Sequence, residues 1–260
     1  MFSKAKPSVL EARFCISTIM KLILAKKGAM TQFFGSDGKV QPVTEICVGT
    51  NRVVSIKTKE KDGYEALQLG LGEKKHASKA LRGQVRGLAF IREDSSFQHL
   101  KEVRTDVTSV SRGDETDISM FTIGERVDAI GWSKGRGYTG VVKRHGFHGQ
   151  KASHGHKDQE RMPGSIGAGG VQHVFKGKRM AGRMGNEQTT VKNLEIIRID
   201  TDTQRLYVKG AVPGWRNGLV MLRSAGSMAF KKATSAHQGD APSLQEAAVD
   251  VKNDVVESEN

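Results

Sequence analysis

Cysteine, long apolar runs and bulky side chains are all scarce in this chain of 260 residues. Its two cysteines, Cys15 and Cys47, have neither metal-site spacing nor the number of a disulfide framework, which fits a reduced intracellular setting. No apolar stretch approaches the roughly 20 residues that cross a bilayer, so no membrane partner is expected. Hydrophobic residues make up only 37% of the chain. This share is below the usual value of roughly 45–50%, so part of the chain must lie outside a core.

Motifs for catalysis are also missing. The chain has no nucleophile elbow, no kinase or zincin motif and no paired carboxylates in a cleft pattern. The glycine-rich run 164–170 lacks the Gly-Lys-Ser/Thr ending of a P-loop, and no strand-to-helix unit surrounds it, which excludes a mononucleotide site. The sequence therefore predicts no enzyme, no catalytic residues and no cofactor.

Positive charge is concentrated in one central segment, residues 132–185. The whole chain has a net charge of +13, and this segment holds eleven Lys and Arg residues against two acids, Asp158 and Glu160. It also holds thirteen of the 30 glycines and five of the eight histidines. Such a segment cannot offset its ordering entropy by burying itself. A polyanionic partner is therefore expected to order it, and nucleic acid is the first candidate.

The residue types of this segment suit contact with RNA. Glycine lets the backbone approach a phosphate closely, and the stretches 133–138 and 175–180 combine it with Lys and Arg. Tyr138, Phe147 and Phe175 add flat faces on which an unpaired base can stack. The alternative is a solvated basic loop with no ligand.

Several other residues, within this segment and at position 215, have two interpretations each. The four histidines between 145 and 156 have tolerable zinc spacing, but the surrounding positive charge disfavours a dication, so no metal is predicted. Salt bridges to neighbouring Lys or Arg account for Asp158 and Glu160. Trp132 and Trp215 end strand-like runs, and packing at a core or barrel edge is favoured over base stacking for both.

Strand-like runs lie on both sides of the basic segment, which indicates one β-rich body that the chain leaves and re-enters. Many short strands with few helices favour a small barrel or sandwich. A short helix is expected over 78–91, capped by Ser78. The expected strands are 21–25, 40–48, 52–57, 65–69, 101–107, 118–132, 191–200, 205–212 and 219–223.

The two ends differ from this body. Residues 1–19 are expected to be a disordered extension, a weak organelle presequence or a mis-assigned start before Met20. Residues 227–260 are expected to form a disordered acidic tail.

Several motifs in order resemble the bacterial ribosomal protein L3 family, a universal family of the large subunit, over about Met20 to Ser224. The most specific stretches are Ser133-Lys-Gly-Arg-Gly-Tyr-Thr-Gly140, Arg161-Met-Pro-Gly-Ser-Ile-Gly167 and Val174-Phe-Lys-Gly-Lys-Arg-Met-Ala-Gly182. Others are Met20-Lys-Leu-Ile-Leu-Ala-Lys-Lys-Gly-Ala-Met-Thr-Gln32 and Val208-Lys-Gly-Ala-Val-Pro-Gly214.

The resemblance implies a mainly β fold, with a translation-factor-like β-barrel body (strands at about 20–58, 118–131 and 186–224) and a small α+β insertion at about 62–117. It implies that loop 132–185 penetrates large-subunit rRNA and extends toward the peptidyl-transferase centre. The implied role is structural: binding near the 3′ region of that rRNA, early assembly, and contact with neighbouring large-subunit ribosomal proteins. The ribosome of the cytoplasm is expected over that of an organelle. The alternative function is a transient RNA chaperone or ribosome-assembly factor.

The resemblance also implies individual contacts. Gln150 matches a position that some bacterial members methylate to N5-methylglutamine, which would require a glutamine methyltransferase; an unmodified polar contact to RNA is an equal alternative. The expected RNA-binding residues are Lys134, Arg136, Tyr138, Lys143, Arg144, His145, His148, Lys151, His154, Lys157, Arg161, Lys176, Lys178, Arg179 and Arg183.

Overall fold

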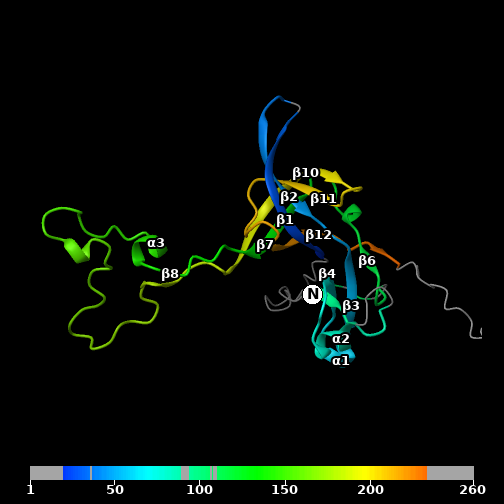
Figure 1. The fold of residues 1–260 in the computed structure, drawn as a ribbon, viewed down its shortest axis with the longest axis horizontal. Coiled ribbons are helices and arrows are strands. Elements are labelled where there is room, and N and C mark those ends of the chain that lie inside the picture. The colour runs from blue at the N-terminus through cyan, green and yellow to red at the C-terminus, as the bar shows by residue number, and fades with distance from the viewer. Residues whose placement is uncertain (1–19, 36, 89–93, 106, 108–109, 233–260) are drawn as a thin grey trace, which may run out of the picture.

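A closed β-barrel forms the centre of the protein (Figure 1). The computed structural model describes residues 20–35, 37–88, 94–105, 107 and 110–232, so the predictions for 1–19 and for 233–260 lie outside the described residues. Every neighbouring pair of barrel strands is antiparallel, in the order β1-β12-β7-β10-β11-β2. These strands are β1 (Met20–Phe34), β2 (Val40–Cys47), β7 (Arg126–Trp132), β10 (Gln188–Asp200), β11 (Arg205–Lys209) and β12 (Leu219–Ala225). The mainly β fold with a barrel is confirmed.

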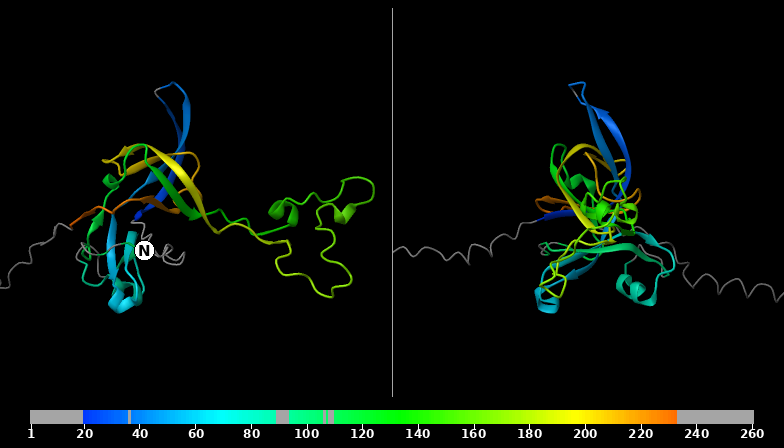
Figure 2. Two further views of the ribbon diagram at one scale, coloured as in Figure 1. Left: turned by 180° about the vertical axis from the view of Figure 1, so that it is seen from behind. Right: turned by 90° about the vertical axis from the view of Figure 1, so that its left-hand side faces the viewer.

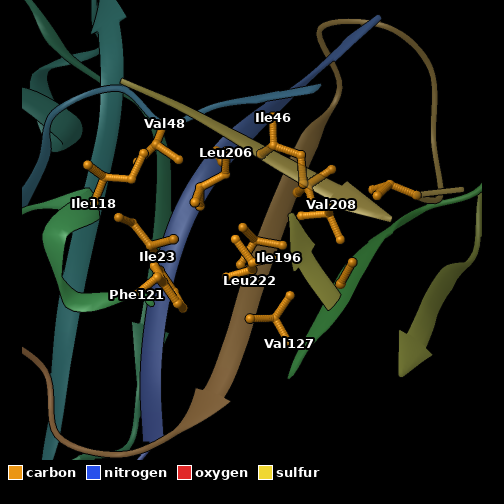
Figure 3. Close-up of a cluster of buried hydrophobic side chains, with 14 of the residues drawn as sticks. Ile23, Ile46, Val48, Ile118, Phe121, Val127, Ile196, Leu206, Val208 and Leu222 are labelled. Carbon is orange, nitrogen blue, oxygen red and sulfur yellow. The ribbon is translucent and has the colours of Figure 1, made fainter. Parts of the chain in front are cut away.

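The barrel is filled by aliphatic side chains from all six strands, as Figure 3 shows for Ile23, Ile46, Val127, Ile196 and Leu222. Alternate residues of a strand point to opposite faces, so β1 serves two cores. Ile23 and Ala25 point into the barrel, whereas Leu22 and Leu24 belong to a second buried cluster outside it. The barrel therefore has one outer face that must also be covered.

A five-stranded sheet covers that face, in the order β13-β6-β3-β4-β5. Its residues Val53, Leu67 and Leu69 pack against Leu24 and Met221 of the barrel. No helix in the described part of the chain is long and apolar enough to cross a membrane. The elements of this layer are β3 (Asn51–Lys57), α1 (Lys59–Asp62), β4 (Ala66–Lys74), α2 (Lys79–Val85), β5 (Ser96–Val103), β6 (Glu115–Thr116) and β13 (Phe230–Lys231).

Some expected boundaries differ from the structure. The barrel strands were expected to run to residue 58, but β3 lies in the second sheet, because a short connection through α1 and the left-handed Gly63 folds it onto β4. The expected strand 118–132 is a 3-10 turn, η2 (Ile118–Met120), followed by β7. The Asp117 side chain accepts a hydrogen bond from the Ile118 N–H and starts that turn.

Two further segments, the short helix and the expected disordered tail, are shorter than predicted. The helix expected over 78–91 covers only Lys79–Val85, and Gly87, at a φ of +86°, lies just beyond its end. The Ser78 side chain makes no capping hydrogen bond. Within the segment expected to be a disordered tail, Phe230 and Lys231 form β13 and pair with β6.

Asn51 joins the barrel to the second sheet. Its side chain is fully buried, and its Oδ1 accepts a hydrogen bond from the Leu24 N–H at 3.0 Å. Its Nδ2 donates to the carbonyl oxygens of Leu24 at 2.9 Å and Gly49 at 2.8 Å. On this edge of β1, pairing with β2 begins only at Lys26, so the Asn51 amide replaces a missing strand. An open strand edge in a buried layer would otherwise leave polar groups unpaired.

We expect Asn51→Ala to lower the free energy of unfolding by about 3 kcal/mol, because each buried polar group left unpaired costs roughly 1–3 kcal/mol. Urea denaturation followed by circular dichroism measures the loss. Gln188→Ala is the control, since that exposed amide on β10 should change stability by less than about 0.5 kcal/mol. Equal denaturation midpoints for the two variants would show that Asn51 does not join the layers.

Candidate nucleic-acid interface

The basic segment leaves the barrel between two paired strands. Trp132, the last residue of β7, lies opposite Gln188, the first residue of β10. The pairing continues outward, since the Ser133 N–H donates to the Glu187 carbonyl at 2.9 Å and the Arg136 N–H to the Met184 carbonyl at 2.9 Å. The short strands β8 (Tyr138–Thr139) and β9 (Gly182–Arg183) extend it. We call residues 133–140 and 181–187 the stem.

Beyond the stem the chain makes a long excursion away from the barrel, seen in green to yellow-green in Figures 1 and 2. It contains the short helix α3 (Val141–His145) and the 3-10 turn η3 (Lys157–Gln159). Within residues 132–185, all of which the structure describes, only Thr139 and Val141 are buried. This segment therefore has almost no core of its own, as its composition predicts.

The cations of the segment face solvent. All are exposed except Arg144, which is partly buried, and none forms an ion pair with a described acid. Neither Asp158 nor Glu160 forms a salt bridge with a described Lys or Arg, so the predicted salt bridges of these two acids are wrong. The positive charge is therefore available to an external polyanion.

Arg144 and His145, at the end of α3, are held by the returning leg of the stem. Arg144 Nη1 donates to the Met180 carbonyl at 2.8 Å, and His145 Nε2 lies 3.0 Å from the same oxygen. A Cβ on Gly182 would lie 2.6 Å from Arg144 Nη1, so the guanidinium lies directly against the backbone at this glycine. Both side chains are thus fixed before any ligand arrives.

A pocket of about 610 Å³ opens where the stem meets the barrel, and we call it the root pocket. It brings together five of the predicted RNA-binding residues, and its lining includes a single acid, Glu187. The lining residues are Ser133, Lys134, Arg136, Arg144, His145, Arg183, Met184, Gly185, Glu187, Pro213 and Gly214.

The other predicted RNA-binding residues do not gather at this pocket. Tyr138 lies in β8 of the stem, and the other nine are distributed over α3 and the excursion beyond it, all of them exposed. These nine residues are Lys143, His148, Lys151, His154, Lys157, Arg161, Lys176, Lys178 and Arg179. Their separation suits many single contacts along a polymer rather than one compact site.

Sequence reasoning missed the part of the root pocket that the barrel supplies. Pro213 and Gly214 follow β11, and Pro213 packs against Gly131, where a Cβ would lie 3.2 Å from the Pro213 ring. Behind them, Lys27 Nζ donates to the carbonyls of Val212 at 2.7 Å and Gly214 at 3.0 Å. Burial, and next the charge of Lys134, lower the pKa of Lys27 below its usual value. The motif 208–214 was noticed in the sequence, but nothing in it indicated that Pro213 and Gly214 line a pocket with the stem.

Aromatic side chains differ in their exposure. Tyr138 is 81% exposed and Phe175 58% exposed, so both rings are open to a base, whereas Phe147 is partly buried near His145. Trp132 packs against the second core, with Lys101 Nζ 4.8 Å from its ring centroid, which confirms the packing prediction. Trp215 is 47% exposed, so the same prediction holds only in part there.

The histidines do not form a metal centre in this geometry. Among the described residues, no three His, Cys, Asp or Glu side chains lie together as metal ligands would. His145 instead contacts the Met180 carbonyl, and His173 packs edge-on against Phe175 at 5.6 Å between centroids.

Comparisons with known proteins found one matching family profile and several similar sequences. A family profile described as ribosomal protein L3 matches residues 104–206. A protein of Dehalococcoides mccartyi named large ribosomal subunit protein uL3 is 46% identical over 206 residues, covering 78% of this chain and 98% of the relative. Proteins with the same name from Herpetosiphon aurantiacus (46%, covering 78% of this chain and 95% of the relative) and Roseiflexus (48%, covering 78% and 96%) are similar over 207 residues each.

The close approach of the two legs of the stem can be tested at Gly185. Gly185 has a φ of +76°, and a Cβ there would lie 2.2 Å from the Lys134 carbonyl oxygen. Gly137 has a similar φ of +65° but no atom within 4 Å of its Cβ position. We expect Gly185→Ala to remove the hydrogen-exchange protection of the Arg136 and Met184 amides, while Gly137→Ala retains it because it adds backbone strain alone.

Amide exchange measured by NMR distinguishes the two variants, with barrel amides such as Leu24 as an internal reference. Equal protection of the stem amides in both variants would contradict the close contact between Gly185 and Lys134.

Proposed function

The chain belongs to the ribosomal protein L3 family, and from that premise we propose that it is a structural protein of the large ribosomal subunit that binds large-subunit rRNA through residues 132–185. The observation that carries this proposal is the segment itself. It presents eleven cations, none paired with a described acid, on a backbone with only two buried residues. Folded RNA supplies both the phosphates and the enclosing surface that such a segment lacks.

The exposed apolar side chains of the excursion support the same partner. Met162, Val174 and Phe175 are 41–58% exposed, on a segment with no hydrophobic cluster of its own. A solvated loop would leave these groups in water, whereas RNA offers base faces and sugar edges to cover them. The basic loop with no ligand is therefore the weaker interpretation.

The finer role is the one that the family resemblance implies, and the shape of the molecule is compatible with it. The excursion extends far from the barrel, so we propose that the barrel binds near the 3′ region of the rRNA while the loop extends toward the peptidyl-transferase centre (Figure 1). A protein that crosses several RNA segments must enter before they close around it, which supports a role in early assembly. Neighbouring ribosomal proteins would contact the remaining surface. The protein would be located on the ribosome in the cytoplasm.

We expect the double variant Lys178→Ala/Arg179→Ala to incorporate less well into large subunits and to bind rRNA with a weaker dependence on salt. Each lost phosphate contact should reduce the slope of log affinity against log salt by about 0.7 for single-stranded RNA. The control is Lys74→Ala/Lys75→Ala, an exposed adjacent pair at the end of β4.

Sucrose-gradient sedimentation of tagged protein after a high-salt wash measures incorporation. Wild-type protein that leaves the large-subunit peak during the wash would instead favour a transient RNA chaperone or assembly factor. If both double variants incorporated like the wild type, the loop would not be the RNA contact.

We also propose that Gln150 is methylated by a glutamine methyltransferase. Its side chain is exposed, and its N–H donates to the Glu160 carbonyl at 2.9 Å, which fixes the turn that presents it. The intact mass of protein purified from native ribosomes should exceed the sequence mass by one methyl group, and Gln150→Ala should remove the increment. A native mass equal to the unmodified sequence would leave Gln150 as a plain polar contact.

A further inference from the structure

The root pocket differs from the rest of the basic segment because its cations converge. Lys134 and Arg136 come from the outgoing leg, Arg183 from the returning leg and Arg144 from α3, and all four line one concavity. The only acid in the lining is Glu187, whose side chain is exposed. Like charges brought together in this way repel one another, so the free protein maintains an arrangement that an anion would stabilise.

Arg144 carries the strongest indication of a ligand. It is the one partly buried cation of the segment, and a guanidinium withdrawn from water normally has a carboxylate partner. Here no described acid pairs with it, and among the described residues its side chain donates one hydrogen bond, from Nη1 to the Met180 carbonyl. That bond holds the guanidinium beside the backbone of Gly182. Its remaining N–H groups suit a bidentate acceptor such as a phosphate.

The barrel side of the root pocket adds to its positive potential. Lys27 lies behind Gly214, bound to the carbonyls of Val212 and Gly214. Its pKa is lowered by burial and by the charge of Lys134, so the two ammonium groups repel each other at this point. Lys27 thus adds a positive charge next to Gly214, which lines the pocket.

An aromatic ring lies beside the pocket. Tyr138 of β8 is directly opposite Arg183 of β9, and residues opposite each other in an antiparallel pair project from the same face. The Tyr138 ring, which is 81% exposed, therefore flanks a cation that lines the pocket. A phosphate group in the pocket would place its attached base within reach of this ring.

We propose that the root pocket is a binding site for the phosphodiester group of a single unpaired RNA nucleotide, whose base stacks on Tyr138. This proposal rests on the proposed function and makes it more specific. Contacts along the excursion are spread over separate exposed side chains, whereas the root pocket holds one phosphate at a fixed position relative to the barrel. It would set the register of the protein on its RNA.

The test is a titration of the isotopically labelled full-length protein, followed by NMR, with three separate probes: the dinucleotide UpU, uridine and inorganic phosphate. UpU should shift the amides of Gly185 and Arg183 and the Arg144 Nε–H in a saturable way, and uridine should not. Inorganic phosphate should shift the same signals with weaker affinity, because it lacks the stacking contribution of the base.

Three variants make the result specific. Arg144→Gln should weaken UpU binding about tenfold, the loss expected for a charge-assisted hydrogen bond. Glu187→Gln removes the single acid of the lining and should strengthen binding. Lys74→Ala/Lys75→Ala, which removes two exposed charges outside the pocket, should leave UpU affinity unchanged.

The outcomes separate this proposal from the proposed function. Saturable UpU shifts that weaken in Arg144→Gln and strengthen in Glu187→Gln support the nucleotide site. Equal affinity for inorganic phosphate and UpU would overturn it in favour of a simple anion site, and the absence of shifts at the root would overturn it altogether. Because the titration uses free protein, these results hold whatever sedimentation shows about incorporation into the large subunit.

Discussion

The pairing of β7 with β10 is the constraint on which the rest of this structure depends. The two strands are neighbours in a closed barrel, and they are also the two legs of a segment that cannot fold by itself. Because a closed barrel leaves no free edge among its strands, the positions of Trp132 and Gln188 are set by the whole hydrophobic core. The stem continues this pairing outward, so the order of the barrel extends to Arg183 without any further core.

That rigidity has a source in the double use of β1. Ile23 contributes to the barrel interior, while Leu24 packs under the second sheet, and the Asn51 amide closes the polar edge between them. The barrel is thus tied to a second layer at the strand that begins the fold. Without that layer, an apolar outer face of β1, β7 and β12 would lie in water. The small sheet stabilises the support for the basic segment, although it lies away from that segment.

Sequence reasoning succeeded where the physical cause is local and failed where it is distant. The charge and glycine content of 132–185 are visible residue by residue, and so are the strand-like runs of the barrel. The assignment of 51–57 to the barrel failed because strand character does not specify the sheet that a strand joins. The root pocket was missed because it depends on pairs such as Arg144 with Met180 and Gly131 with Pro213, which only the folded chain brings together.

Under the proposed function, the segment combines two kinds of RNA recognition with different physical demands. Exposed lysines and arginines of the excursion need only proximity to phosphates, so their contribution falls as salt screens it and depends little on exact geometry. Arg144 and His145 are positioned in advance by contacts with the Met180 carbonyl, so their side chains lose little ordering entropy when an anion binds there. A chain that must be ordered by its partner gains from such a fixed point, because each further contact then forms from a shorter free loop. The placement of the fixed point at the barrel, and not at the tip, follows from this argument: only the barrel end of the segment is held by a core.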